Sequence, residues 1–142
     1  MKSLDIAIKK LNQEDLSFIL VKEGVVLKKS KDSGIMPILS VYLEGVSLLE
    51  GGAVADKVIG RAAAVLLREG KISRLYAKLI SKDALKMLQD AGVEIKYDEL
   101  VETILNRDKT DRCPMEKLAQ GEESGTVLAK KICDFIGLQY EN

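Results

Sequence analysis

The sequence predicts an α/β fold in which a mixed sheet is covered by helices on both faces. Two short apolar runs, residues 17–22 and 25–29, flank Glu23-Gly24, as is typical of a β-hairpin. Farther along, extended runs alternate with segments of helical periodicity, as in the crossovers that join parallel strands. An antiparallel pair followed by such crossovers gives a mixed sheet.

The composition is that of one ordered domain. The chain has 142 residues, close to the commonest domain size, so we expect a single domain over residues 1–142. Hydrophobic residues make up 46% and charged residues 31%, which excludes a disordered segment. Lys+Arg and Asp+Glu both number 22, so no net charge recruits nucleic acid or an anionic membrane surface. We expect neither as a partner.

The sequence also indicates a cytoplasmic location. No apolar run approaches the ~20 residues of a membrane span, and charges interrupt the N-terminal residues where a signal peptide would be apolar. In that compartment the two cysteines are expected to be free thiols. The absence of histidine and tryptophan, with many Lys, Glu and Arg residues, favours a thermostable protein.

The first half of the chain contains a helix, the hairpin and a second helix. Ser3 is the expected N-cap of the first helix. Its apolar face is formed by Leu4, Ala7, Ile8 and Leu11. After the hairpin and a polar loop over 30–34, Pro37 opens a short apolar helix over 38–44 that Gly45 ends.

We assign a long helix to residues 53–69, after Gly51-Gly52 and before Gly70. This segment is apolar on nearly every side, so we expect neighbouring elements to cover it all round. The elements that follow are a strand over 72–80, a helix over 82–91 capped by Ser81, a strand over 93–97, extended structure over 98–106, a charged loop over 107–112, a short helix opened by Pro114, and a last helix capped by Ser124 and closed by Gly137.

Three charged residues lie in the first turns of the predicted 53–69 helix: Asp56, Lys57 and Arg61. Lys57 and Arg61 are four residues apart, so they would share one face of a helix. An anion there would relieve their repulsion and bind the backbone N–H groups that Gly51-Gly52 leaves accessible. The pattern predicts a phosphate or carboxylate pocket. The alternative is a protruding helix end in which Asp56 pairs with one of the cations.

Cys113-Pro114-Met115-Glu116 is the second candidate site. Proline suits the first helical position, which makes Cys113 the N-cap. The positive end of the helix, together with Arg112 and Lys117, favours the thiolate form. Glu116 fits the return half of a capping box, and the alternative role is that of an acid or base beside the thiol. Cys113 and Glu116 are therefore the catalytic candidates.

A metal centre is not expected. Zinc requires three or four ligands, drawn mainly from cysteine and histidine. Cys113 and Cys133 are the two cysteines and the chain has no histidine. Cys133 lies among apolar residues of the last helix and is expected to be a core residue. We expect neither a metal nor another cofactor.

The hairpin, the Gly-Gly loop, the string DKVIGRAAA over 56–64 and the string CPME over 113–116 together resemble an uncharacterised bacterial family with the cytidine-deaminase-like fold. The resemblance implies a three-layer α/β/α sandwich around a mixed sheet, with no established activity. Deaminases carry His-x-Glu after the hairpin and Pro-Cys-x-x-Cys at the next strand-to-helix junction. Here the first helix offers Asp56, Lys57 and Arg61, and the junction at 80–84 has no thiol. This departure excludes deamination by a zinc-bound hydroxide.

The leading hypothesis is a protein that binds a small nucleotide-like or other anionic molecule. Lys57 and Arg61 would hold the anionic group, Asp56 would orient a polar group, and Cys113 would act as nucleophile or acceptor in a metal-independent transfer reaction. This requires the first turns of the 53–69 helix and the Cys113 helix to open onto one hollow. The alternative is a non-catalytic binding or assembly module, in which the apolar segment 35–49 could form a homodimer surface or lie in the core.

Overall fold

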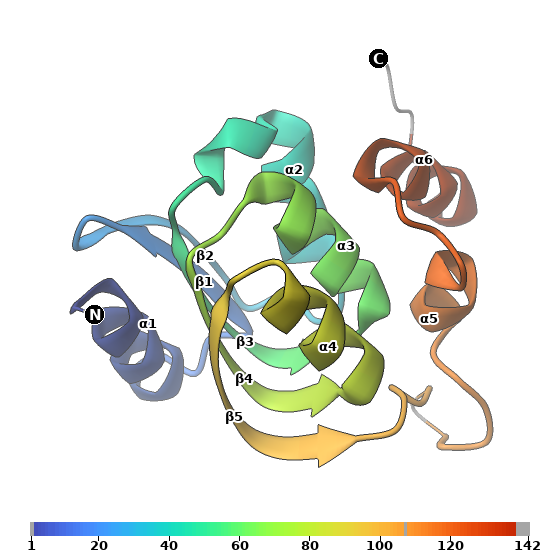
Figure 1. The fold of residues 1–142 in the computed structure, drawn as a ribbon, viewed down its shortest axis with the longest axis horizontal. Helices are drawn as coiled ribbons and strands as arrows, with labels where there is room; N and C mark the ends of the chain where they lie inside the picture. The colour runs from blue at the N-terminus through green and yellow to red at the C-terminus, as the bar shows by residue number, and fades with distance from the viewer. Residues whose placement is uncertain (1, 107, 139–142) are drawn as a thin grey trace.

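The structure is a computed structural model that describes residues 2–106 and 108–138. Figure 1 shows one twisted sheet with helices on both of its faces. The elements are, in chain order, α1 (Lys2–Gln13), β1 (Phe18–Lys22), β2 (Val25–Ser30), α2 (Met36–Glu44), the 3₁₀ turn η1 (Val46–Leu48), β3 (Ala53–Ile59), α3 (Arg61–Gly70), β4 (Arg74–Ser81), α4 (Lys82–Asp90), β5 (Glu94–Val101), α5 (Pro114–Ala119) and α6 (Gly125–Ile136). Arg107, the first residue of the predicted charged loop, lies outside the described residues.

The sheet is mixed, as predicted. Its strand order is β2-β1-β3-β4-β5, with β1 antiparallel to both β2 and β3. β3, β4 and β5 are parallel to one another. The hairpin turn places Glu23 and Gly24 at φ 50° and 78°, the left-handed conformation that tight two-residue hairpins require.

The helices form layers on the two faces of the sheet. α1 packs on one face, against β1, β3 and β4, and encloses a small apolar cluster. α2, α3 and α4 cover the other face above the larger core, as Figure 1 shows. α5 and α6 pack on α3, so they add a further pair of helices outside this layer. The predicted α/β/α sandwich is confirmed.

The single long helix predicted over 53–69 is wrong for its first half. Residues 53–59 form β3, which lies between β1 and β4, and the helix begins only at Arg61. A central strand has both faces covered, so it is apolar on both sides and shows no alternation. Periodicity cannot distinguish such a run from a buried helix, although the β-branched Val54, Val58 and Ile59 favour a strand.

Most other element ends agree with the prediction. Ser81 and Ser124 cap α4 and α6 by accepting hydrogen bonds from Ala84 N and Val127 N, each at 3.2 Å. Gly137 ends α6 in the left-handed conformation. Ser3, in contrast, is not an N-cap, because α1 already includes Lys2 and the Ser3 hydroxyl accepts a hydrogen bond from Gly24 N.

The apolar segment 35–49 contributes to the core. It forms α2 and η1. Ile38, Leu39, Val41 and Leu49 are buried against α3 and the sheet. Of the two roles expected for this segment, a homodimer surface or part of the core, the structure shows burial in the core. Among the described residues, no helix is long and apolar enough to cross a membrane.

Candidate functional site

The predicted pair of cations is not a pair in the structure. Because β3 is a strand, Lys57 projects on the α1 side of the sheet, where its Nζ lies 3.1 Å from Asp15 Oδ1. Arg61 is the first residue of α3 on the opposite side. The premise that both cations share one helix face is wrong, and with it the basis for an anion pocket between them.

Gly51 and Gly52 lie at the other end of β3 from Arg61. Gly51 has φ 73°, which a turn requires and which favours glycine. A Cβ on Gly52 would lie 2.6 Å from Leu20 Cδ1 and 3.0 Å from the carbonyl oxygen of Leu49. Both glycines therefore serve the turn into β3 and the close packing beside it. Neither lies at the N-terminus of a helix, as the predicted anion site required.

Arg61 joins α3 to the turn between α5 and α6. Its side chain is largely buried and donates to the carbonyl oxygens of Ala119, at 2.7 Å, and Glu122, at 2.9 Å. The same guanidinium forms ion pairs with Asp83, at 3.0 Å, and Glu123, at 2.8 Å. Four of its five N–H donors are therefore used within the chain. Arg61 holds neighbouring elements together, and its charge is already matched by two carboxylates.

Asp56 is a buried carboxyl near the middle of β3. It is 4% exposed, and its Oδ1 accepts a hydrogen bond from Val58 N at 3.0 Å. Its Oδ2 has no hydrogen-bond partner among the described residues. Burial raises the pKa of this carboxyl to about 8, so it is largely protonated at neutral pH.

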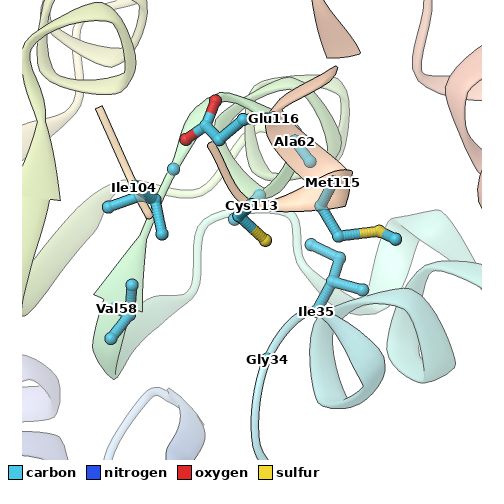
Figure 2. A pocket seen from close by; sticks show the side chains of 10 residues that line it. Gly34, Ile35, Val58, Ala62, Ile104, Cys113, Met115 and Glu116 are labelled. Carbon is cyan, nitrogen blue, oxygen red and sulfur yellow. The ribbon is translucent and has the colours of Figure 1, made fainter. Parts of the chain in front are cut away.

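An apolar hollow lies at the carboxyl end of β3 (Figure 2). Its volume, including the part open to solvent, is about 430 Å³. Its apolar walls come from Ile35, Val58, Ala62, Ile104 and Met115. They come from four segments of the chain: the loop before α2, the junction of β3 and α3, the segment after β5, and the start of α5.

Cys113 and Glu116 supply the polar side chains of this hollow. Cys113 is the N-cap of α5, as predicted, and its N–H donates to the carbonyl oxygen of Ile104 at 2.8 Å. The thiol is free and partly exposed. Figure 2 shows the sulfur pointing into the space between Val58 and Ile35.

Glu116 caps a helix, but not its own. Its Oε1 and Oε2 accept from Arg61 N at 3.1 and 3.3 Å, so the carboxylate closes the N-terminus of α3. The predicted capping box is wrong because the Cys113 N–H is already bonded to Ile104. Burial raises the pKa of the Glu116 carboxyl, although its bond to Arg61 N opposes the shift. In Figure 2 this carboxylate points away from the Cys113 sulfur, which gives no support to an acid or base role beside the thiol.

Glu116 also explains Gly60, the residue between β3 and α3. A Cβ on Gly60 would lie 2.1 Å from Glu116 Oε1 and 2.9 Å from Ile104 Cγ1. Any larger residue would displace the carboxylate that caps α3. Gly60 was predicted to lie inside the 53–69 helix, so both its place at the start of α3 and its contact with Glu116 required the fold.

A second, polar hollow adjoins the first. Its lining includes Arg61, Asp83, Glu102 and Arg112, and Glu116 lines both hollows. Both lie near the carboxyl ends of the parallel strands, where sheets of this kind form a crevice. No group of three or more His, Cys, Asp or Glu residues in the described part of the chain is arranged to hold a metal ion.

Comparisons with known proteins give one strong likeness. The sequence model of the family described as "Domain of unknown function (DUF1893)" matches residues 6–136. The crystal structure of a DUF1893 family protein (TM1506) from Thermotoga maritima is 33% identical, with a TM-score of 0.83, over 94% of this chain and 89% of that one.

A much weaker likeness is to a diaminohydroxyphosphoribosylaminopyrimidine deaminase/5-amino-6-(5-phosphoribosylamino)uracil reductase from Thermotoga maritima. It is 15% identical, with a TM-score of 0.47, over 91% of this chain and 41% of that one. A likeness of this size supports no conclusion about activity. None of the curated proteins compared with the chain matches it.

Proposed function

The chain belongs to the DUF1893 family, whose description names no activity, and we propose that it binds a small molecule in the apolar hollow between β3, α3 and α5. The observation that carries the proposal is the hollow itself. It is assembled from four separate segments of the chain and is lined by a free thiol. The room in it for the centre of a water molecule is about 80 Å³, which suits a compact ligand.

The walls favour a compact, mostly apolar and uncharged ligand. Ile35, Val58 and Met115 offer dispersion contacts and no hydrogen bonds. The polar groups at the hollow are the Cys113 thiol and the Glu116 carboxyl, neither of which attracts an anion. An anionic ligand lacks support because Lys57 and Arg61 are already paired with carboxylates.

A transfer reaction through Cys113 is a second candidate, favoured by the direction of the thiol into the hollow. The thiolate would attack an electrophilic carbon of the bound molecule, forming a carbon–sulfur bond. The leaving group would depart with its bonding electron pair and take up the proton that the thiol has lost. The product of this step is an adduct on Cys113.

Filling the hollow tests the proposal. Val58 is 40% exposed at the rim, so Val58→Trp should occupy the space without replacing a core residue. Val25→Trp is the matched control, since Val25 is a 59% exposed strand valine on β2, away from the hollow. The neutral fluorescent dye prodan serves as probe. We expect Val58→Trp to weaken prodan binding at least about tenfold and Val25→Trp to leave it unchanged.

Mass spectrometry of freshly purified protein distinguishes binding from transfer. A molecule seen in the native spectrum and lost on denaturation supports binding, and an adduct that survives denaturation and maps to Cys113 supports transfer. The proposal is wrong if the native mass is that of the bare chain and prodan binds the two tryptophan variants equally.

A further inference from the structure

β5 forms an open edge of the sheet. In the order β2-β1-β3-β4-β5 it pairs with β4 alone, so the backbone groups on its outer side meet no other strand of the sheet. Figure 1 shows no helix or strand beyond it on that side. An eight-residue edge of this kind is a template for pairing with a further strand.

The two edge strands differ in whether their charged side chains are paired within the chain. On β2, Lys28 and Lys29 are neutralised within the chain, by Glu44 at 2.6 Å and Glu14 at 2.7 Å. On β5, Lys96 has no ion-pair partner among the described residues. Asp98 receives a hydrogen bond from the Tyr76 hydroxyl on Oδ2, at 2.6 Å, while its Oδ1 has no partner in the described part of the chain. Glu99 also has no ion-pair partner in the described part of the chain, but it projects on the opposite side of the sheet from Lys96 and Asp98. Lys96 and Asp98 are thus one unmatched cation and one half-used carboxylate.

These two charges lie on the same side of the sheet. Lys96 is in register with Tyr76, which packs beneath α1, and Asp98 contacts the hydroxyl of that tyrosine. Tyr97, in register with Ala77 of the larger core, projects on the other side and is 42% exposed.

A second copy of β5 fits this edge as an antiparallel strand with Tyr97 at the two-fold axis. A two-fold axis perpendicular to the sheet makes the two strands antiparallel and keeps each face on its own side. With Tyr97 opposite its own copy, Lys96 faces the partner's Asp98, and this ion pair occurs twice. A shift of the axis by one residue would place Lys96 opposite the partner's Lys96, or Asp98 opposite the partner's Asp98, which is repulsive.

We propose that β5 is the interface of a homodimer, in which two five-stranded sheets join into one continuous sheet. Backbone hydrogen bonds between the two β5 strands supply most of the contact, and the paired tyrosines add an aromatic contact at the axis. The Lys96–Asp98 pairs favour this register over those with the axis one residue away, at Lys96 or at Asp98. This inference is independent of the ligand hollow, which lies at the ends of the strands rather than along this edge.

A charge exchange tests the register. Lys96→Asp and Asp98→Lys each place like charges opposite one another, and we expect each to raise the dimer Kd at least about tenfold at low salt. The double variant Lys96→Asp/Asp98→Lys restores opposite charges across the interface and should recover the dimer. Because it also lacks the Tyr76–Asp98 hydrogen bond, its recovery would show that repulsion between the two copies, and not the loss of that bond, weakens the single variants. Lys29→Asp on β2 is the control. Sedimentation equilibrium reports the Kd. A native mass of one chain at every concentration, or a double variant as weak as the single ones, overturns the proposal.

A disulfide tests the position of the axis. Facing residues of antiparallel strands have Cα atoms about 4.5–5.5 Å apart, which a disulfide can span. In a Cys113→Ser background, Tyr97→Cys should form a cross-linked dimer on mild oxidation. Leu27→Cys, on the exposed β2 edge, should not. Equal cross-linking of both variants, or none with Tyr97→Cys, contradicts the proposed interface.

Discussion

Gly60 must lack a side chain because the Glu116 carboxylate lies where its Cβ would be. Gly60 has φ −106° and ψ −172°, an extended conformation open to any residue, so backbone strain does not require glycine there. The requirement is steric, because the Glu116 carboxylate occupies the place of a Cβ while it caps α3. One contact thus connects the end of β3, the start of α3 and the first turn of α5.

Asp56 is the second residue whose chemistry depends on the fold. An isolated buried carboxylate is strongly disfavoured, and Asp56 has a single backbone donor on Oδ1 to offset the loss of water. Its folded-state pKa of about 8 lies above the reference value of 3.8, so the folded state binds the proton more tightly than the unfolded state. The free energy of unfolding therefore falls as the pH rises from about 4 to about 8.

Asp56→Asn should remove this pH dependence. The amide cannot ionise, so we expect the variant to resemble wild type near pH 4 and to exceed it at pH 8 by about 3 kcal/mol or more. Urea denaturation at pH 4, 6 and 8 measures the difference. Asp90→Asn, at the exposed end of α4, should follow wild type. Parallel pH profiles for wild type and Asp56→Asn would contradict the assignment.

At the scale of elements, α3 is the part on which the α5–α6 pair is anchored. Apolar residues of α5 and α6, among them Ala119, Leu128 and Ile132, are buried in the larger core. Polar bonds from α3 complete the attachment. Arg61 and Arg68 both bind Glu123, and Glu69 accepts a hydrogen bond from Gly125 N. These contacts also hold in place the start of α5, which lines one side of the ligand hollow.

Removing the Arg61 guanidinium should loosen α5 and α6 first. Arg61→Met keeps the apolar stem but leaves the carbonyls of Ala119 and Glu122 and the Asp83 carboxylate without their donor, so we expect a loss of about 3 kcal/mol in the free energy of unfolding. Amide hydrogen exchange should accelerate in α5 and α6 before the sheet. Arg74→Met, which removes an exposed ion pair with Glu94, should cost less than about 1 kcal/mol. Equal losses in the two variants would contradict the anchoring role.

At the scale of the whole molecule, the two cysteines differ in their access to solvent. Cys113 lines the hollow and is partly exposed, whereas Cys133 is buried in the core between α6 and α3. Burial also raises the pKa of the Cys133 thiol, which lowers its thiolate fraction.

Native protein should therefore react with iodoacetamide at one thiol. We expect rapid labelling of Cys113 and labelling of Cys133 only when the core opens, at a rate that rises with denaturant concentration. Intact-mass spectrometry with peptide mapping follows both sites in one sample. Comparable labelling rates for the two thiols without denaturant would contradict the placement of Cys133 in the core.

The elements with local signals were predictable. The Glu23-Gly24 hairpin, the Ser81 and Ser124 caps, the Gly137 stop and the Cys113-Pro114 helix start all agree with the structure. Each of these features is decided by the residues that form it or by their immediate neighbours. β3 was not predictable in this way, because a strand covered on both faces has no periodicity to distinguish it from a buried helix.

By itself, the sequence determined that the sheet is mixed and covered by helices on both faces, although not its central strand β3, and it placed a thiol at the start of α5. Short-range turn, cap and hydrophobic patterns specify these features. The tertiary structure alone decided which charges meet. It paired Lys57 with Asp15 and Arg61 with Asp83, and it brought Glu116 to the start of α3. The physical reason is that the partner of a buried or paired charge can lie anywhere along the chain, and chain folding, rather than spacing in the sequence, brings the two together.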